Sequence, residues 1–106
     1  MVLQLVLWNV GDADADIDEL RAHLRDAGVD KNARLPGLLL SVWVSDEASE
    51  RWGYVQLWSS RDAAEQPFLP ETRELLGKDP EIVDLFDVEA TASVAKELAR
   101  LGLAYR

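Results

Sequence analysis

The chain has 106 residues, the length of one domain, and its 48% hydrophobic and 29% charged residues are an ordinary globular composition. Its formal net charge of -9 would repel phosphate backbones and anionic lipids, so we expect no nucleic acid and no membrane as a partner. The absence of cysteine excludes disulfides, thiolate nucleophiles and sulfur-bound metals. We expect a single domain over 1–106. The apolar start has no basic leader and is too short to span a bilayer, which predicts a cytoplasmic protein.

The first 34 residues predict a strand, a turn and a helix. Residues 2–10 are apolar on both faces of the predicted strand, which must therefore be covered on both. Asp16, followed three residues later by Glu19, is placed to cap a helix. Gly28 is expected to end that helix with a left-handed residue, and residues 29–34 to connect it to the next strand.

The segments 38–44 and 52–58 predict a β-hairpin that opens on Pro36-Gly37. One face of its second strand carries three aromatic rings and one amide, from Trp52, Tyr54, Gln56 and Trp58. Such a face can fill a core, but aromatic rings interleaved with one amide are more typical of a ligand-pocket wall.

The second half of the chain predicts another helix and another strand. Ser59 or Ser60 is expected to cap a helix that Pro67 and Pro70 kink or restart. A helical piece over 72–76 then ends at Gly77. Residues 81–89 predict a last strand, and an apolar spacing at 94, 98 and 101 predicts a short C-terminal helix.

This order of elements predicts an α+β fold of the ferredoxin-like βαββαβ type, with a four-stranded antiparallel sheet plus a C-terminal helix. Two helices cover one face of such a sheet. We expect Val55, Leu57 and the even-numbered apolar residues of the first strand on the other face, namely Val2, Val6, Trp8 and Val10. An open apolar face predicts a homodimer that packs sheet against sheet in a dimeric α/β barrel.

Several short motifs run along the chain, among them Pro36-Gly37-Leu38, the strand motif over 53–58, the helix start over 61–65 and Phe86-Asp87-Val88. These motifs resemble the dimeric α/β-barrel superfamily, and more narrowly the bacterial monooxygenases related to YdhR. The resemblance covers nearly the whole chain. It implies the same fold, a homodimer, a small-molecule substrate, and cofactor-independent oxidation of an enolisable aromatic or polycyclic compound by dioxygen. The same pocket would equally serve a cyclase, isomerase or dehydratase, or a non-catalytic ligand-binding dimer.

The chain departs from the family pattern where a His-Thr dipeptide follows an aromatic-Leu pair. Here Phe68-Leu69 is followed by Pro70, Glu71 and Thr72, so a carboxylate stands at the expected imidazole position. The haem-degrading relatives would also need a histidine iron ligand on the second helix, and the chain has none there. We therefore expect no haem and no other cofactor.

His23 or Glu71 is the expected base, because imidazole and carboxylate groups accept protons near neutral pH. Asn9, Arg73 and Tyr54 are the expected contacts to a substrate oxyanion. The expected substrate-binding residues are Trp43, Gln56, Trp58 and Phe68. The competing interpretations are a solvent-facing His23, surface ion pairs for Glu71 and Arg73, and plain core packing for the tryptophans.

The acidic run from Asp12 to Glu19 invites a comparison with a calcium-binding loop. A loop of the EF-hand type needs glycine at its sixth position and glutamate at its twelfth, but these positions hold Ile17 and His23. We interpret the run as a helix start and predict no metal site.

Overall fold

A computed structural model describes residues 1–65, 71–92 and 96 of the chain. Its strands are β1 (Val2–Asn9), β2 (Leu38–Asp46), β3 (Arg51–Trp58) and β4 (Ile82–Asp87). Its helical elements are α1 (Ile17–His23), the π-helical turn η1 (Leu24–Gly28), α2 (Val29–Asn32), α3 (Arg61–Ala64) and α4 (Glu71–Leu76). The expected C-terminal helix and the segment with Pro67 and Pro70 lie outside the described residues.

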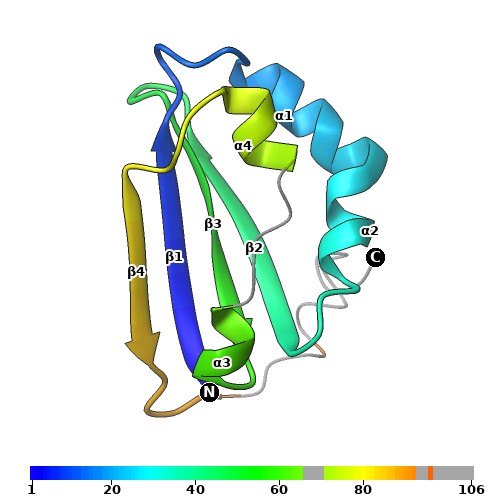
Figure 1. The fold of residues 1–106 in the computed structure, drawn as a ribbon, viewed down its shortest axis with the longest axis vertical. Helices are drawn as coiled ribbons and strands as arrows, with labels where there is room; N and C mark the ends of the chain where they lie inside the picture. Colours follow the sequence, from blue (N-terminus) through cyan, green and yellow to red (C-terminus); the bar gives the residue numbers. More distant parts are fainter. Residues whose placement is uncertain (66–70, 93–95, 97–106) are drawn as a thin grey trace.

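The four strands form one antiparallel sheet in the order β2-β3-β1-β4. The helical elements lie on one side of it, as Figure 1 shows. This arrangement confirms the predicted ferredoxin-like fold. In the described part of the chain, no helix is long and apolar enough to cross a membrane.

The first helix begins where the sequence predicts but continues past its expected end. Asp16 caps it, and its side chain accepts a hydrogen bond of 2.9 Å from the backbone N–H of Glu19. The prediction that Gly28 ends this helix is wrong. Gly28 is right-handed, at φ −61°, and the chain passes through η1 into α2. Gly28 is buried, and a Cβ built on it would lie 3.1 Å from Leu24 Cδ2, so this glycine provides close packing rather than a helix stop.

Serine and glycine mark the ends of the later helices. Ser60 caps α3 by accepting a hydrogen bond from the backbone N–H of Ala63, and Gly77 follows α4 at φ +70°. Gly37, before β2, also has a positive φ, and a Cβ there would lie 2.6 Å from Ala63 Cβ. The Pro36-Gly37 turn therefore lets the start of β2 approach α3 closely.

The register of the sheet decides which side chains face the helices. Val2 pairs with Trp58, and Trp8 pairs with Trp52, so the even-numbered residues of β1 share the aromatic face of β3. The prediction that the even-numbered apolar residues of β1 lie on the open face is therefore wrong. The helices cover the face that carries the largest rings, and Leu3, Leu5 and Leu7 remain on the other.

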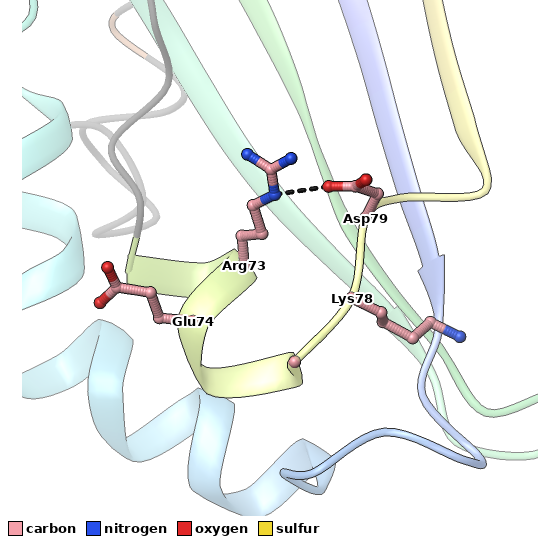
Figure 2. Close-up of a pocket in the computed structure, with 5 residues that line it drawn as sticks. Arg73, Glu74, Lys78 and Asp79 are labelled. Atoms are coloured by element: carbon pink, nitrogen blue, oxygen red, sulfur yellow. Dashed lines mark ion pairs between the residues drawn. The ribbon is translucent and has the colours of Figure 1, made fainter.

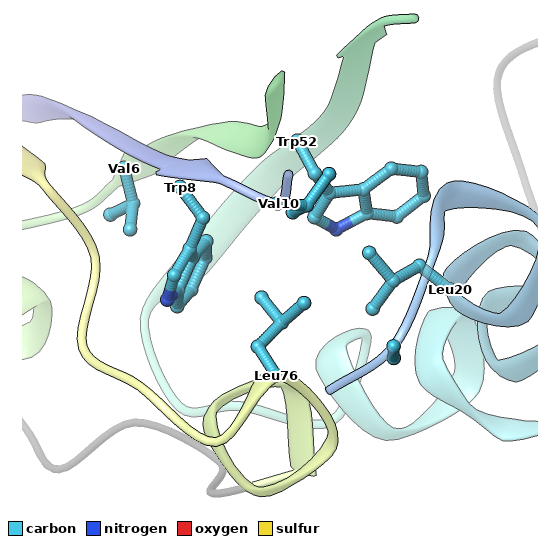
Figure 3. Packing of buried hydrophobic residues seen from close by; sticks show 7 residues of the cluster. Val6, Trp8, Val10, Leu20, Trp52 and Leu76 are labelled. Atoms are coloured by element: carbon cyan, nitrogen blue, oxygen red, sulfur yellow. The ribbon is translucent and has the colours of Figure 1, made fainter. Parts of the chain in front are cut away.

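A packed apolar core lies between α1, α4 and the ends of β1 and β3, as Figure 3 shows. Leu20 from α1 and Leu76 from α4 are almost fully buried there. They pack with Trp8 and Trp52 from the sheet. We call this set, completed by Val6, Val10 and Ala15, the packed core.

The opposite side of the sheet is apolar across all four strands and is uncovered in the chain that the structure describes. Val42 on β2 is 45% exposed, and Phe86 on β4 is 51% exposed. We call this surface the open face; its apolar members are Leu3, Leu5, Leu7, Leu40, Val42, Val44, Val55, Leu57, Ile82 and Phe86.

Candidate functional site

A row of polar side chains crosses the helix-facing side of the sheet. Gln4 on β1 pairs with Gln56 on β3, and Gln56 pairs with Ser41 on β2. We call these three residues the polar row. Gln4 is 6% exposed and Gln56 is 2% exposed, so two amides are buried in an otherwise apolar layer. The row lies between the packed core and a second apolar cluster that contains Val2 and Trp58.

Hydrogen bonds hold the nitrogen end of the Gln56 amide. Gln56 Nε2 donates to Asn32 Oδ1 and to Ser41 Oγ, both at 3.3 Å. Asn32 lies at the end of α2, and its Nδ2 donates to the backbone oxygen of Gly28 at 2.9 Å. The helix end is thereby tied to the middle of the sheet.

Three buried polar atoms of this region have no hydrogen-bond partner among the described residues. They are the amide oxygens of Gln4 and Gln56 and the indole nitrogen of Trp58. Trp58 is 2% exposed and lies on the same face as both glutamines. A buried polar atom without a partner costs about 1–3 kcal/mol. Two acceptors and one donor of this kind, side by side, are typical of a site that a polar ligand completes.

Aromatic rings adjoin the polar row on the packed-core side. Tyr54 pairs with Val6 and Trp43 in the neighbouring row, and its ring stacks on Trp8 with centroids 5.9 Å apart. Burial raises the pKa of the Tyr54 phenol well above its usual range, so this group stays neutral and able to donate. The structure thus keeps Trp52, Tyr54, Gln56 and Trp58 on one face, as predicted, and pairs Trp43 of β2 with Tyr54 on that face.

The structure describes the side chain of only one of the two alternative bases, His23. His23 is the last residue of α1 and is half-buried, and its side chain makes no hydrogen bond to a described residue. Glu71 begins α4, but its side chain lies outside the description. Phe68 lies outside the described residues altogether.

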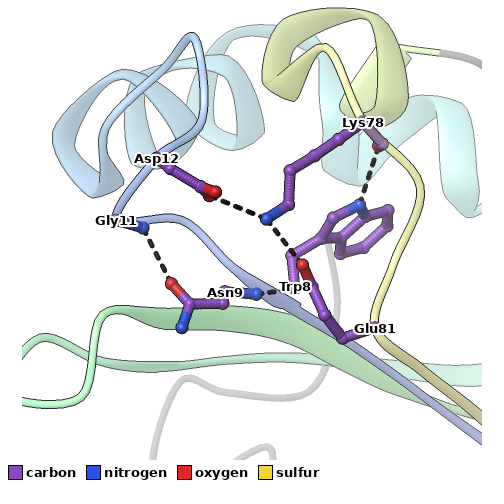
Figure 4. Close-up of polar contacts among 6 residues, drawn as sticks. All are labelled: Trp8, Asn9, Gly11, Asp12, Lys78 and Glu81. Carbon is purple, nitrogen blue, oxygen red and sulfur yellow. Dashed lines mark hydrogen bonds and ion pairs between the residues drawn. The ribbon is translucent and has the colours of Figure 1, made fainter.

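Asn9 is not brought to this site. It is exposed at the end of β1, seven residues from Val2, the residue that pairs with Trp58. Its Oδ1 accepts a hydrogen bond of 3.0 Å from the Gly11 backbone, as Figure 4 shows. The expected grouping of Asn9 with Tyr54 and Trp58 is therefore wrong, because Asn9 lies on the opposite face of the sheet from both and at the opposite end of the strand pair from Trp58.

Lys78 organises the surface around Asn9. Its Nζ forms ion pairs with Asp12, at 2.9 Å, and with Glu81, at 2.5 Å. Its backbone oxygen accepts a hydrogen bond of 3.1 Å from Trp8 Nε1 (Figure 4). The indole of Trp8 thus has a partner, unlike the indole of Trp58.

No described contact joins Arg73 to the polar row. It is exposed on α4 and forms an ion pair with Asp79, as Figure 2 shows. Both residues line a shallow surface hollow of about 310 Å³ with Glu74, Gly77 and Lys78. The expected contact of Arg73 with a substrate oxyanion stays a prediction, since the ion pair described for this residue is with Asp79. Across 1–65, 71–92 and 96, no group of three or more His, Asp or Glu side chains is placed to hold a metal ion.

Three residues of the site were not singled out as candidates from the sequence. Gln4 stands between leucines in an apolar strand, and a buried amide at that position is a usable signal. Asn32 and Ser41 look like ordinary loop and strand residues. Only the register of β2 on β3 and the continuation of the helix past Gly28 bring them to Gln56.

Comparison with known proteins finds a likeness to solved structures. No family model matches the chain, and no curated protein matches it. Among solved structures, the chain is similar to a variant of SnoaB, a cofactor-independent oxygenase from Streptomyces nogalater. The TM-score is 0.58 at 21% sequence identity, over 85% of this chain and 94% of that one. This likeness shows the ferredoxin-like fold that SnoaB has.

Proposed function

We propose that the protein is a cofactor-independent monooxygenase that oxidises an enolisable aromatic or polycyclic small molecule with dioxygen. The observation that carries the proposal is the set of unpartnered buried atoms on Gln4, Gln56 and Trp58, beside a wall of aromatic rings. The fold shared with SnoaB, a cofactor-independent oxygenase, supports the proposal. We also propose that the protein is related to the YdhR-type monooxygenases and that it is cytoplasmic.

The chemistry requires a carbanion or phenolate that gives electrons to dioxygen inside a dry pocket. With anthrone, the methylene carbon loses two hydrogens and gains one oxygen atom as a ketone, while the second oxygen atom leaves as water. Trp58 Nε1–H is the described donor available to stabilise the anionic oxygen, and this replaces Asn9 and Arg73 in that role. Neutral Tyr54 is a further donor. Trp43 provides a ring surface for stacking.

His23 and Glu71 remain the two candidate bases. A base must lie within hydrogen-bond reach of the proton that it removes, directly or through one water. His23 lies on the helix that continues into η1 and α2, the segment that delivers Asn32 to the polar row. This connection favours His23 as the group to test first.

We also propose that two copies pack through the open face. Five of its apolar residues are at least 37% exposed, an unusual surface for a small monomer: Leu40, Val42, Val44, Ile82 and Phe86. Phe86 and Val83 offer a matched test because both are 51% exposed on β4 but lie on opposite faces. Phe86→Glu should convert the dimer to a monomer in light-scattering chromatography, whereas Val83→Glu should not. A wild-type monomer at micromolar concentration would contradict the dimer.

A ligand-binding dimer without catalysis is the second candidate. It is favoured by the absence of a carboxylate or imidazole among Gln4, Asn32, Ser41, Gln56 and Trp58, which form the polar contacts around the row. This function predicts tight binding of an aromatic ligand and no turnover.

Oxygen uptake tests the proposal. Metal-free protein is mixed with anthrone and a chelator, against a protein-free control that measures spontaneous oxidation, with oxygen-18 gas as the isotopic label. We expect faster uptake that is insensitive to chelator, with one labelled atom in the new ketone. Binding without uptake would favour the second candidate. Ring closure, isomerisation or dehydration of a panel substrate without uptake would favour the cyclase, isomerase or dehydratase function. Chelator-sensitive uptake would overturn the proposal.

A further inference from the structure

The orientation of the Gln56 amide is fixed by groups that cannot exchange their roles. The backbone oxygen of Gly28 can only accept a hydrogen bond, so the Asn32 group 2.9 Å from it must be the NH₂. Asn32 therefore presents its oxygen to Gln56, at 3.3 Å, and Gln56 must answer with its own NH₂. The Gln56 oxygen is left buried and without a partner in the part of the chain that the structure describes.

Ser41 does not fix this orientation. A hydroxyl group can donate or accept, so Ser41 would pair with either end of the Gln56 amide. Asn32 alone, tied to Gly28, decides which end is free. Asn32 reaches the sheet because η1 continues the first helix into α2.

The free atom of Gln56 is thus a hydrogen-bond acceptor with no proton to offer. Directly opposite, on β1, the Gln4 oxygen is a second buried acceptor. A carboxylate or phosphate next to these two oxygens would be repelled. A hydroxyl or N–H group on the ligand would satisfy them.

We infer that Asn32 is a positioning residue that sets ligand specificity: by fixing the Gln56 amide, it makes this site select ligands with a hydroxyl or N–H donor at that point. The inference rests on the proposed function, since it names the substrate class of the same site. It goes further by assigning a neutral phenol or enol hydroxyl to Gln56, with the anionic oxygen left to Trp58.

A pair of probes tests the inference without turnover. The first is 2-hydroxyanthrone, whose hydroxyl is too far from its ketone for an internal hydrogen bond, and the second is its methyl ether. Binding is measured under nitrogen by calorimetry. The wild-type protein should prefer the hydroxyl probe by about tenfold, because the ether leaves the Gln56 oxygen unpaired. In Asn32→Ala the Gln56 amide is free to turn, and the preference should fall toward one.

Two variants separate positioning from a merely structural role. Asn32→Asp keeps an acceptor for Gln56 Nε2, so the preference should persist even if both affinities fall. Asp30→Ala, at an exposed position of the same helix, should leave both affinities unchanged. A structural role would weaken both probes equally in Asn32→Ala, and an unchanged ratio there would overturn the inference.

The same measurements distinguish failure of the inference about Asn32 from failure of the proposed function. Binding of both probes with equal affinity by wild-type protein overturns the assignment of Asn32 and Gln56 and leaves the ligand site standing. Failure of both probes to bind overturns the site itself, and the inference with it.

Discussion

The two halves of the space between sheet and helices differ in how well their polar atoms are satisfied. In the packed core, the buried indole of Trp8 donates to the Lys78 backbone, and leucines from two helices fill the surroundings. At the polar row, two amide oxygens and the indole of Trp58 are buried on the same face without partners among the described residues. The packed core satisfies its buried polar group internally, whereas the polar row leaves polar atoms that a ligand could satisfy.

From this difference we infer that the packed core mainly provides stability and that the polar row mainly provides ligand binding. Unpaired buried polar groups lower the free energy of unfolding, and a protein tolerates them where a ligand supplies the partner. Substitutions in the packed core should therefore mainly lower stability, whereas substitutions at the polar row should mainly lower ligand affinity.

The largest effect on stability is expected from Leu20→Ala in the packed core. Leu20 is 2% exposed, and removing its buried methyl groups should lower the free energy of unfolding by about 2–5 kcal/mol. Chemical denaturation measures this loss. Leu39→Ala, at a 53% exposed position, is the control and should change stability little. Equal losses in the two variants would contradict the placement of the core.

The sharpest contrast in binding is expected between Trp58→Phe and Trp52→Phe. Both tryptophans are buried on the helix-facing side of β3, and both variants lose comparable packing. Trp58→Phe removes the buried donor that has no partner among the described residues, whereas Trp52 lies at the other end of β3, opposite Trp8. A hydrogen bond to a charged group contributes about 1.5–3 kcal/mol, so affinity for the anthrone anion should fall about 10- to 100-fold. Calorimetry under nitrogen measures both, and a similar fall in Trp52→Phe would contradict the assignment.

A smaller effect, of opposite sign, is expected from Gln4→Leu. Leucine has a similar size and removes a buried oxygen without a partner, so stability should stay constant or rise by about 1 kcal/mol. Ligand affinity should fall in the same variant. If unfolding instead became easier by more than about 2 kcal/mol, Gln4 would belong to the structural half of the interior.

The smallest effect concerns the surface ion pairs at the end of the packed core. The Lys78 ammonium holds the pKa values of Asp12 and Glu81 below their usual range. Groups with lowered pKa values stabilise the fold above their unfolded pKa, about 4, and lose this contribution as pH falls through the folded value. The melting temperature of Lys78→Met should therefore trail that of wild type near pH 7. The gap should close below pH about 3, as calorimetry would show. A gap that persists at the lowest pH would contradict the ionic origin.

The fold could be predicted from the sequence, whereas only part of the site could. Period-two patterns located the four strands, and Asp16, Ser60 and Gly77 marked helix ends as expected. The helix end predicted at Gly28 was wrong because glycine can allow close packing inside a helix as well as end a helix in the left-handed conformation.

The faces of β1 could not be assigned from the sequence, because both are apolar and only the pairing of Val2 with Trp58 decides between them. The sequence of the predicted hairpin was enough to identify four site residues, namely Trp43, Tyr54, Gln56 and Trp58. Asn32 depends on contacts between distant elements that no local pattern records.

The indole N–H signals of the tryptophans provide the most direct test of the two-half account. In ¹⁵N-labelled protein, signals assigned by Trp→Phe variants report separately on Trp8, bonded to Lys78, and on Trp58, which is free for a ligand. Addition of anthrone under nitrogen should shift the Trp58 signal strongly and leave the Trp8 signal in place. A shift of Trp8 without Trp58, or no shift of either at saturating anthrone, would contradict the account.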